Sequence, residues 1–365
     1  MDTPLRIGVI GAGGISHSHL LAYRSRTNRD LARVVAIADV DEARAREQAK
    51  TYGIDGVYTD WRAMVASDAI DAVSICTPPF LHVEQSCEAL RAGKSVLCEK
   101  PVSPTLAGID AIAEAERAGG AAFAGVFQHR VGQGARQVKG LIEQGRFGRL
   151  LFGLAETFWQ RDQAYYDVWW RGTWEQECGG ATMGQAIHSI DMLTWLMGEP
   201  VSVVADAATV QLAIEVEDSS AAVVRFRDGA MATLSITVNA QDNRSRLEFF
   251  GSKLQAVSSE SAYDPTATPF RLTSRDAAYA EACMGEAERI APEETKHLHV
   301  PMVHDFLRAI IDGRPPLVTA DECRRSMQLI TGLYKSAMTG ARVALPIGPD
   351  DPWYSRIPPK GFALR

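Results

Sequence analysis

The chain has 365 residues, of which 46% are hydrophobic and 23% are charged, and its formal net charge is −7. This composition is ordinary for a globular protein, and the length suffices for two domains with cores of their own. The negative charge and the shortness of basic runs such as residues 24–26 argue against a nucleic-acid partner or an acidic membrane surface.

Targeting and metal-binding signals are weak. The N-terminus passes directly into a predicted strand, and no apolar run is long enough to span a bilayer, so we expect a cytoplasmic protein without a membrane partner. The six cysteines have no paired spacing, which favours reduced thiols over disulfides or a zinc site. We predict no metal site. The candidate histidines are irregularly spaced and no carboxylate pattern accompanies them; they are His17, His19, His297, His299 and His304.

The first predicted element is a strand over residues 5–10, followed by a glycine turn at residues 11–16 and a helix-like run over residues 17–26. This order lets backbone N–H groups approach a pyrophosphate, whose charge the start of the helix stabilises. Ser16 stands where a third glycine or alanine is usual, and it is still small. The turn residues predicted to bind a dinucleotide are Gly11, Gly13, Gly14 and Ile15.

A second predicted strand, residues 33–38, ends at Asp39. A carboxylate at this place accepts hydrogen bonds from the ribose hydroxyls of NAD and repels the 2′-phosphate of NADP. We therefore predict NAD as the cofactor, with NADP disfavoured. Asp39 could instead cap the helix that begins near residue 41.

Strands and helices then alternate. A short helix over residues 60–66 precedes a buried strand over residues 71–76, and a helix over residues 82–92 precedes the next strand. This alternation predicts an α/β fold with a doubly wound parallel sheet. The loop after residue 76 lies beside the glycine turn in such a sheet, and its residues predicted to face the cofactor are Thr77, Pro78 and His82.

The next strand ends in Val96-Leu97-Cys98-Glu99-Lys100-Pro101. Ligands bind outside the carboxyl ends of parallel strands, so Lys100 is a candidate for chemistry, and both Glu99 and Lys100 are predicted to bind the cofactor. Pro101 favours an extended backbone at Lys100. On these residues alone, a surface Glu–Lys pair beside a turn proline is the favoured interpretation.

The glycine turn, Asp39, the Thr77-Pro78 loop and Glu99-Lys100-Pro101 together resemble the glucose-fructose oxidoreductase, inositol dehydrogenase and rhizopine-catabolism (Gfo/Idh/MocA) family. The similarity extends from about Leu5 to Pro346. It implies an N-terminal Rossmann domain, a C-terminal α+β domain with a large, open, mostly antiparallel sheet, and a dehydrogenase activity.

The segment from Cys178 to Asp191 resembles the glycine-rich helix start with which this family presents an active-site histidine, here His188. The family usually has Asp or Asn four residues earlier, where this chain has Gly184. A carboxylate there would orient the imidazole and raise its basicity. Either Gln185 or a substrate hydroxyl takes over this role, or Lys100 carries more of the proton transfer.

The segment from Tyr165 to Trp174 is rich in aromatic residues. Aromatic faces cover the C–H faces of a sugar or cyclitol, while polar side chains supply directional hydrogen bonds. An aromatic core or a subunit contact would explain the segment equally well. The residues predicted to bind substrate are Lys100, Tyr166, Arg171, Gln185 and His188.

Strand periodicity dominates residues 201–257, with a hairpin turn at Asp228-Gly229. We predict a NAD-binding domain at 1–125, a substrate-binding and oligomerisation domain at 126–345, and a tail at 346–365. The family resemblance implies that another subunit covers the open sheet, which predicts a homodimer or homotetramer.

We predict an NAD-dependent dehydrogenase acting on a secondary hydroxyl of a sugar, sugar acid or cyclitol. Lys100 would polarise the reacting oxygen, and His188 would be the general base in oxidation. Two alternatives keep the fold and the cofactor: a redox-neutral NAD-dependent glycoside hydrolase and a non-catalytic sensor of NAD and sugar.

Overall fold

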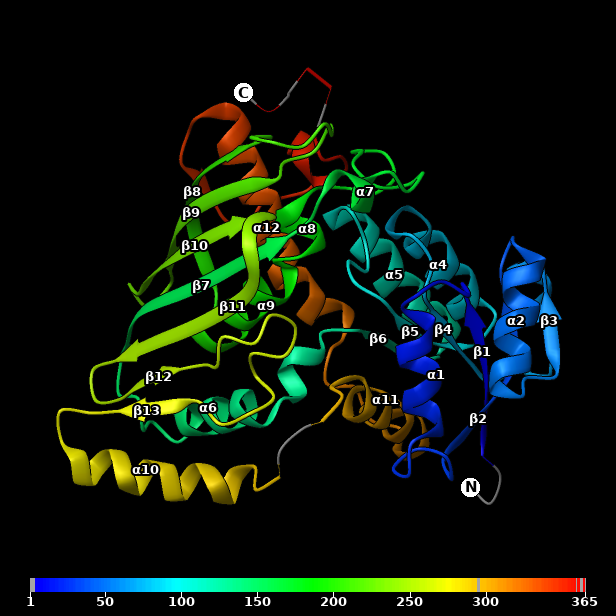
Figure 1. Cartoon of the computed structure of the whole chain (residues 1–365), viewed down its shortest axis with the longest axis horizontal. Helices are drawn as coiled ribbons and strands as arrows, with labels where there is room; N and C mark the ends of the chain where they lie inside the picture. The colour runs from blue at the N-terminus through cyan, green and yellow to red at the C-terminus, as the bar shows by residue number, and fades with distance from the viewer. Residues whose placement is uncertain (1–3, 294–295, 359, 362–363, 365) are drawn as a thin grey trace. The chain divides into compact units, whose positions relative to one another are not determined.

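The computed structural model describes residues 4–293, 296–358, 360–361 and 364 (Figure 1). The chain forms two compact units. The first contains residues 1–103, 107–127 and 299–323, and the second contains residues 104–106, 128–298 and 324–365. The domain limits predicted from the sequence stay predictions, and part of the predicted tail lies outside the described residues.

The first unit contains a six-stranded sheet with the order β3-β2-β1-β4-β5-β6. Every neighbouring pair of strands is parallel, which confirms the doubly wound sheet predicted from the alternation of strands and helices. The strands are β1 (Leu5–Ile10), β2 (Ala32–Ala38), β3 (Gly56–Tyr58), β4 (Ala72–Ile75), β5 (Ser95–Cys98) and β6 (Phe123–Gly125).

The helices of this unit begin and end at residues suited to those positions. Asp41 accepts a hydrogen bond from the Arg44 N–H at the start of α2, and Gly53 ends that helix in the left-handed conformation. Asp60 caps α3 in the same way as Asp41. The helices are α1 (Ser16–Arg24), α2 (Glu42–Tyr52), α3 (Trp61–Val65), the 3-10 turn η1 (Pro79–Leu81), α4 (His82–Arg91), α5 (Leu106–Gly119) and α11 (His299–Asp312).

The central strands β4 and β5 are buried along their whole length, as expected for parallel strands covered on both faces. Val9 and Ile37 on the strands pack with Leu20 of α1 in one apolar cluster. Burial of such side chains contributes about 1.5–3 kcal/mol each. Helix α11 comes from late in the chain and packs against α1 and β5. The carboxyl ends of the strands, where the predicted site residues lie, are therefore mounted on a rigid core.

The second unit contains an eight-stranded sheet with the order β13-β12-β11-β7-β10-β9-β8-β14. Its pairs are antiparallel except for β7 and β10, which run parallel. The predicted hairpin is confirmed: β9 and β10 pair across a turn in which Gly229 has φ of 83°. The strands are β7 (Leu150–Gln160), β8 (Pro200–Ala208), β9 (Ser219–Phe226), β10 (Met231–Thr237), β11 (Asn239–Gly251), β12 (Gln255–Val257), β13 (Arg271–Thr273) and β14 (Val343–Ala344).

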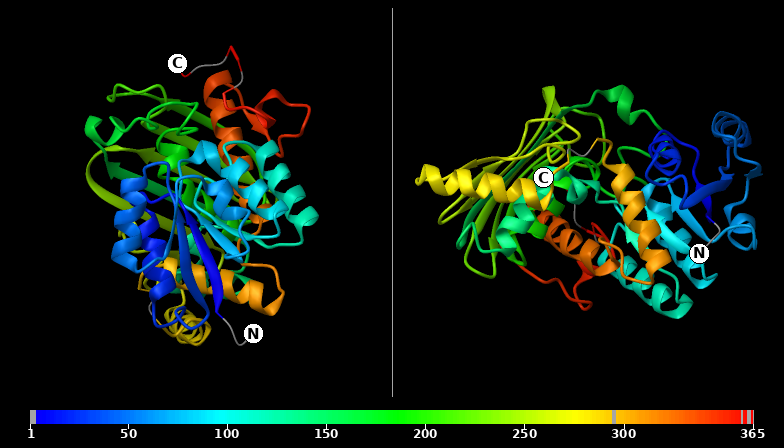
Figure 2. Two further views of the ribbon diagram at one scale, coloured as in Figure 1. Left: turned by 90° about the vertical axis from the view of Figure 1, so that its right-hand side faces the viewer. Right: turned by 90° about the horizontal axis from the view of Figure 1, so that it is seen from below.

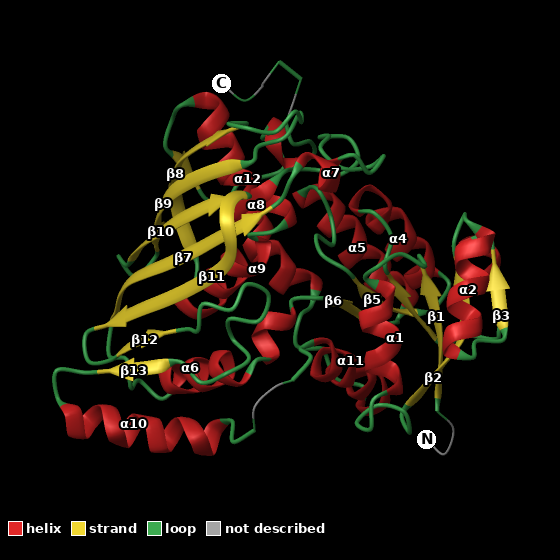
Figure 3. Cartoon of the chain, in the orientation of Figure 1, coloured by secondary structure: helices red, strands yellow, loops and turns green. Residues whose placement is uncertain are grey.

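Helices cover one face of this second sheet (Figure 3). Helix α9 packs on β7, while α10, the long yellow helix of Figure 2, packs against β13 and α6. Along β9 buried and exposed residues alternate, so the opposite face is open to solvent within the single chain. The helical elements are η2 (Gln128–Val131), α6 (Gln133–Glu143), α7 (Gln163–Tyr166), α8 (Ala181–Gly184), α9 (Ile187–Met197), α10 (Ala277–Ile290), α12 (Ala320–Thr339) and the 3-10 turn η3 (Pro352–Tyr354).

Among the residues that the structure describes, no helix combines the length and the apolar character needed to cross a bilayer.

Candidate active site

The glycine turn after β1 has the backbone geometry of a phosphate cradle. Gly11 has φ of 95°, and a Cβ there would lie 2.8 Å from the backbone carbonyl of Cys76. Gly13 and Gly14 have open space where a Cβ would stand. Ile15 at the N-cap of α1 provides no side-chain capping bond. The turn thus leaves room and an uncapped helix start for an anionic group.

Asp39 lies at the carboxyl end of β2 and reaches back to the glycine turn. Its Oδ2 accepts a hydrogen bond of 2.7 Å from the Ala12 N–H, and its Oδ1 accepts one of 2.9 Å from the Asp41 N–H. The helix cap predicted as an alternative role belongs to Asp41. The nearest guanidinium is that of Arg44, whose Nη1 lies 3.9 Å from Oδ2. Asp39 therefore puts a negative charge beside the turn.

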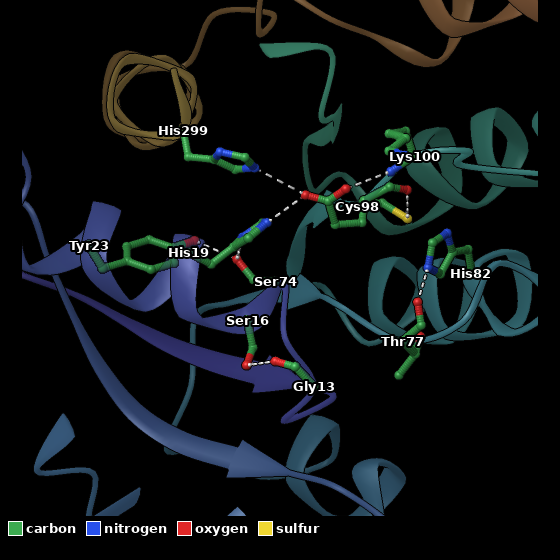
Figure 4. Close-up of polar contacts among 11 residues, drawn as sticks. Gly13, Ser16, His19, Tyr23, Ser74, Thr77, His82, Cys98, Lys100 and His299 are labelled. Atoms are coloured by element: carbon green, nitrogen blue, oxygen red, sulfur yellow. Dashed lines mark hydrogen bonds and ion pairs between the residues drawn. The ribbon is translucent and has the colours of Figure 1, made fainter. Parts of the chain in front are cut away.

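The loop after β4 is tied to the end of β5. The Thr77 hydroxyl donates to Gln85 Oε1 at 2.6 Å. His82 lies with Nε2 at 2.8 Å from the Thr77 carbonyl (Figure 4). Its Nδ1 lies 2.8 Å from the Pro101 carbonyl. Burial lowers the pKa of His82, so the imidazole is neutral and donates to one of the two carbonyls. His82 thus connects the Thr77-Pro78 loop to the turn that carries Lys100.

Lys100 follows β5, as predicted, and its peptide bond to Pro101 is cis. Glu99 is buried, and its Oε2 accepts a hydrogen bond of 3.1 Å from the Lys100 backbone N–H. The other oxygen, Oε1, lies 3.0 Å from His19 Nε2 and 3.4 Å from His299 Nε2. Glu99 is thus held by two histidines as well as by the backbone of its neighbour.

Figure 4 shows that His19 and His299 point from α1 and α11 toward the same carboxylate. On the far side of the His19 ring, Nδ1 lies 3.2 Å from the Ser74 hydroxyl, which also bonds to Tyr23. Burial lowers the pKa of His19. Burial alone would raise the pKa of Glu99, but its bonds to His19 and His299 hold that pKa well below the usual range.

This cluster of His19, Glu99 and His299 is also the arrangement that best suits a metal ion in the described part of the chain, since its ligand atoms lie within 4.8 Å of one another. Hydrogen bonds account for the same arrangement: a neutral His19 that accepts from Ser74 at Nδ1 donates to Glu99 from Nε2. The expectation that the protein binds no metal stays a prediction.

In the second unit, the glycine-rich segment before α8 is pressed against neighbouring backbone. A Cβ on Gly180 would lie 1.8 Å from the Glu217 carbonyl oxygen, and one on Gly179 would lie 2.5 Å from the Tyr334 hydroxyl. The buried Glu217 carboxyl accepts from the N–H groups of Gly180 and Thr182 and from the Tyr334 hydroxyl. Burial raises the pKa of Glu217 to about 7 in spite of these bonds. Glu217 thus fastens the loop that leads to α9.

His188 is the second residue of α9 and is 6% exposed. Its ring centroid lies 4.7 Å from that of His129, whose Nε2 bonds to the Tyr263 carbonyl at 2.8 Å. One turn further along α9, the buried Asp191 forms an ion pair of 2.7 Å with Arg130, which neighbours His129. The segment η2 and the start of α9 are therefore fixed to each other around the His188 ring.

Tyr165, Arg171, Glu177 and Gln185 form a cluster beside this helix start. Arg171 Nη1 lies 3.1 Å from Glu177 Oε1, and Glu177 Oε2 accepts a hydrogen bond of 2.6 Å from the Gly172 N–H. The Arg171 guanidinium carbon lies 4.0 Å from the centroid of the Tyr165 ring. Gln185 Nε2 donates to the Tyr165 hydroxyl at 3.2 Å. The predicted residues Arg171 and Gln185 thus meet at one tyrosine.

The hydroxyl oxygen of Tyr166 and Oε1 of Gln185 are among the polar atoms that are buried without a hydrogen-bond partner in the described part of the chain. Burial raises the pKa of the Tyr166 phenol, which therefore stays protonated. Buried polar groups without partners are rare in folded proteins. Both atoms are accordingly suited to a polar ligand.

The structure thus gathers the predicted residues into two groups, one in each unit. The first unit holds the glycine turn, Asp39, the Thr77 loop, His82, Glu99 and Lys100, all at the carboxyl ends of its strands. The second unit holds Tyr166, Arg171, Gln185 and His188 around the start of α9. Sequence reasoning missed Glu177 and the ring contact of His129 with His188, although both residues adjoin segments that it had selected.

Two family models match the chain. The oxidoreductase family with an NAD-binding Rossmann fold matches residues 5–126, and the GFO/IDH/MocA C-terminal domain matches residues 135–257.

Among curated proteins, a myo-inositol 2-dehydrogenase of Thermotoga maritima is 26% identical over 89% of this chain and 94% of the relative. A D-glucoside 3-dehydrogenase of Escherichia coli is 26% identical over 94% of this chain and 98% of the relative. An inositol 2-dehydrogenase of Burkholderia cenocepacia is 33% identical over 65% of this chain and 68% of the relative.

Among solved structures, the WlbA dehydrogenase of Bordetella pertussis, in complex with NADH and UDP-GlcNAcA, matches with a TM-score of 0.84 and 29% identity. The match covers 95% of this chain and 99% of the other. A levoglucosan dehydrogenase in complex with NADH has a TM-score of 0.80 at 24% identity, covering 94% of this chain and 100% of the other, which shows the shared fold.

Proposed function

Because the chain belongs to the NAD-binding oxidoreductase family that carries the GFO/IDH/MocA C-terminal domain, we propose that it oxidises a secondary hydroxyl of a sugar or cyclitol, or reduces the corresponding ketone. The observation that carries the substrate class is the pair of buried polar atoms at Tyr166 and Gln185 beside an aromatic cluster. The names of the relatives agree with this class, since they are dehydrogenases of inositol and of a glucoside.

The residues of the first unit fit NAD. The open space over Gly13 and Gly14 and the uncapped start of α1 suit a pyrophosphate, and the Asp39 carboxylate suits the ribose hydroxyls. Bound NAD would supply the acceptor for the hydride that leaves the carbinol carbon. The Thr77-Pro78 loop and His82 would support the cofactor from the neighbouring strand end.

The proton of the reacting hydroxyl needs a separate acceptor, because alcohol oxidation removes a hydride from carbon and a proton from oxygen. Lys100 would donate a hydrogen bond to the reacting oxygen and polarise it. His188 would take the proton in oxidation and return it in reduction. Lys100 belongs to the first unit and His188 to the second.

The surroundings of each residue suit its role. Glu99 fixes the backbone at Lys100 through a hydrogen bond, and Glu99 is itself held by His19 and His299. His188 is held by the ring of His129 at the start of a buried helix. Pre-organised groups of this kind lower the free energy needed to reach a reactive geometry.

The quaternary structure belongs to the same proposal. The open face of the second sheet carries exposed apolar side chains such as Val223 and Val204. We propose that a second copy of the chain covers this face in a homodimer or homotetramer, and that the enzyme works in the cytoplasm on a small polyhydroxylated substrate.

The test is a nicotinamide absorbance assay. Purified protein is mixed with NAD or, separately, NADP, and with a panel of aldoses, sugar acids, anhydrosugars and inositols. NADH formation with a subset of these compounds is the expected result. If NAD binds but no compound yields NADH, and no ketose or inosose consumes it, the dehydrogenase proposal is wrong. Glycoside cleavage without accumulation of NADH would then indicate the redox-neutral hydrolase, and binding without turnover the sensor.

A further inference from the structure

Arg171 is a cationic residue of the second unit that is predicted to bind substrate, and its charge is balanced by Glu177. Its side chain is 21% exposed, whereas its partner Glu177 is 3% exposed. The two form an ion pair of 3.1 Å, and Glu177 also accepts the Gly172 N–H. A buried carboxylate without its cation would be strongly unfavourable, so this pair stays together when a ligand binds.

Besides its ion pair with Glu177, the Arg171 guanidinium packs against two aromatic rings. The guanidinium carbon lies 4.0 Å from the Tyr165 ring centroid and 4.1 Å from the Trp170 ring centroid. Contacts of this kind stabilise a cation by about 0.5–2 kcal/mol. A substrate carboxylate near Arg171 would compete with Glu177 and would also be repelled by it.

A second guanidinium, that of Arg161, lies 5.0 Å from the Tyr165 ring. Its two terminal nitrogens are used within the protein: Nη1 donates to the Gln160 carbonyl at 2.6 Å and to Asn243 Oδ1 at 3.3 Å, and Nη2 donates to the Tyr263 hydroxyl at 3.4 Å. Hydrogen bonds therefore hold the Arg161 side chain at the end of β7, beside β11. Its Nε is buried without a hydrogen-bond partner among the described residues.

Apart from Arg161 Nε, the atoms of this cluster that the described residues leave for a ligand include two on uncharged side chains, Gln185 Oε1 and the Tyr166 hydroxyl oxygen. Gln185 Oε1 accepts hydrogen bonds and donates none, so it suits a hydroxyl and is repelled by a carboxylate. The Tyr166 hydroxyl both donates and accepts. Two such groups beside aromatic rings match the vicinal hydroxyls and C–H faces of a neutral polyol.

We propose that Glu177 sets the charge specificity of the site by neutralising Arg171, so that the enzyme selects a neutral sugar or cyclitol over the corresponding sugar acid. This inference rests on the proposed function and narrows its substrate class. Glu177 acts through Arg171 and is a specificity-determining residue.

The first experiment compares matched pairs that differ only at C6, where a hydroxymethyl group is replaced by a carboxylate: D-glucose with D-glucuronate, and D-galactose with D-galacturonate, together with myo-inositol as a further neutral compound. The kcat/KM of each is measured with NAD. We expect the neutral member of a pair to exceed the acid by at least about 100-fold, as for a ligand charge that meets a like charge at close range. Equal or higher kcat/KM for the acids would overturn the inference.

The second experiment removes the neutralising charge. Glu177→Gln leaves Arg171 with a net positive charge, and Glu175→Gln removes an equal charge from an exposed position of the same loop. We expect Glu177→Gln to shift the acid-to-neutral ratio of kcat/KM toward the acid by at least about tenfold, and Glu175→Gln to leave the ratio unchanged. An unchanged ratio in a folded Glu177→Gln protein would overturn the inference.

The failure of this inference differs from the failure of the proposed function. If no neutral or acidic compound exchanges hydride with NAD, the proposed function fails. If acids are the better substrates, or if Arg161→Gln abolishes a strong activity on acids, the dehydrogenase stands and the role of Glu177 falls. If Glu177→Gln does not fold, the preference of the unmodified enzyme within each matched pair decides the question alone.

Discussion

The carboxylate of Glu177 lies 3.8 Å from the position that a Cβ atom would take on Gly184. Gly184 stands four residues before His188, where the resemblance to the Gfo/Idh/MocA family leads one to expect Asp or Asn. The sequence therefore lacks a carboxylate at this position, but the fold brings the carboxylate of Glu177 close to it from the loop that precedes α8.

This relationship predicts the effect of restoring the acid. Gly184→Asp would place a second carboxylate close to Glu177, and like charges at this distance oppose each other. We expect a loss of about 1–3 kcal/mol in the free energy of unfolding at pH 8, and a smaller loss at pH 5, where a carboxyl with a raised pKa is protonated. Urea denaturation at the two pH values measures this difference.

Two control variants separate the effect of the added charge on stability from the effect of the added side-chain volume. Gly184→Ala adds the Cβ alone, at ordinary contact distance from Glu177, and should be neutral or stabilising because alanine favours a helix. Combining Gly184→Asp with Glu177→Gln should recover most of the lost stability. A Gly184→Asp protein as stable as Gly184→Ala at pH 8 would contradict the proximity of the two charges.

Glu217 predicts a pH dependence of stability. Its pKa is about 7 in the folded protein against a reference of 4.5, so the folded state binds the proton more tightly between these values. Stability therefore falls as pH rises from about 4.5 to about 7, by on the order of 3 kcal/mol from this group alone. Glu217→Gln should remove this slope, whatever its effect on absolute stability.

The measurement is the free energy of unfolding at pH 5.5 and pH 8 for the unmodified protein and for Glu217→Gln. The matched control is Glu215→Gln, at an exposed position two residues away, which should keep the original slope. A slope that Glu217→Gln leaves intact would mean that Glu217 is already ionised at pH 5.5.

Asp39 predicts a change of cofactor preference. Asp39→Ser removes the charge that repels a 2′-phosphate, and it also removes one of the two carboxylates beside Arg44, so that this guanidinium attracts the phosphate more strongly. The ratio of kcat/KM for NADP to that for NAD should rise at least about tenfold. Asp41→Ser removes another partner of Arg44 without touching the glycine turn and should change the ratio less. Equal effects of the two variants would argue against a direct contact of Asp39 with the ribose.

The open face of the second sheet predicts self-association. Val223 is 37% exposed in the single chain and lies on β9, which pairs with β10 along one edge and with β8 along the other. Val223→Arg should lower the mass measured by light scattering to that of a smaller assembly, because a buried unpaired charge opposes the interface. Val210→Arg, at a position that is 70% exposed outside the strands, is the control. A monomeric unmodified protein would contradict the proposed oligomer.

Local signals in the sequence predicted much of the fold. The strand–glycine turn–helix order, Asp39 at the end of β2, and the Asp228-Gly229 hairpin were all readable, because each depends on residues close together in the chain. The parallel pairing of β7 with β10 was not readable, since it joins segments that lie far apart and no local period specifies a partner strand.

In the candidate site, too, local motifs were readable from the sequence and contacts between distant residues were not. Lys100 and His188 were selected from local motifs. The contact of His299 with Glu99 joins residues 200 positions apart, and Glu177 approaches Gly184 because a loop folds back on itself. Such contacts follow from packing between segments, which the pattern of a single segment does not encode.

The central claim is that the chain is a dehydrogenase in which Lys100 handles the reacting oxygen. The most direct measurement is kcat for Lys100→Met on the best substrate of the panel, together with the Kd of NAD, with Lys50→Met, an exposed residue of α2, as control. We predict a fall in kcat of about 100-fold to 10,000-fold with the Kd of NAD nearly unchanged, and no effect in the control. A Lys100→Met enzyme that turns over at the rate of the unmodified protein would contradict the account.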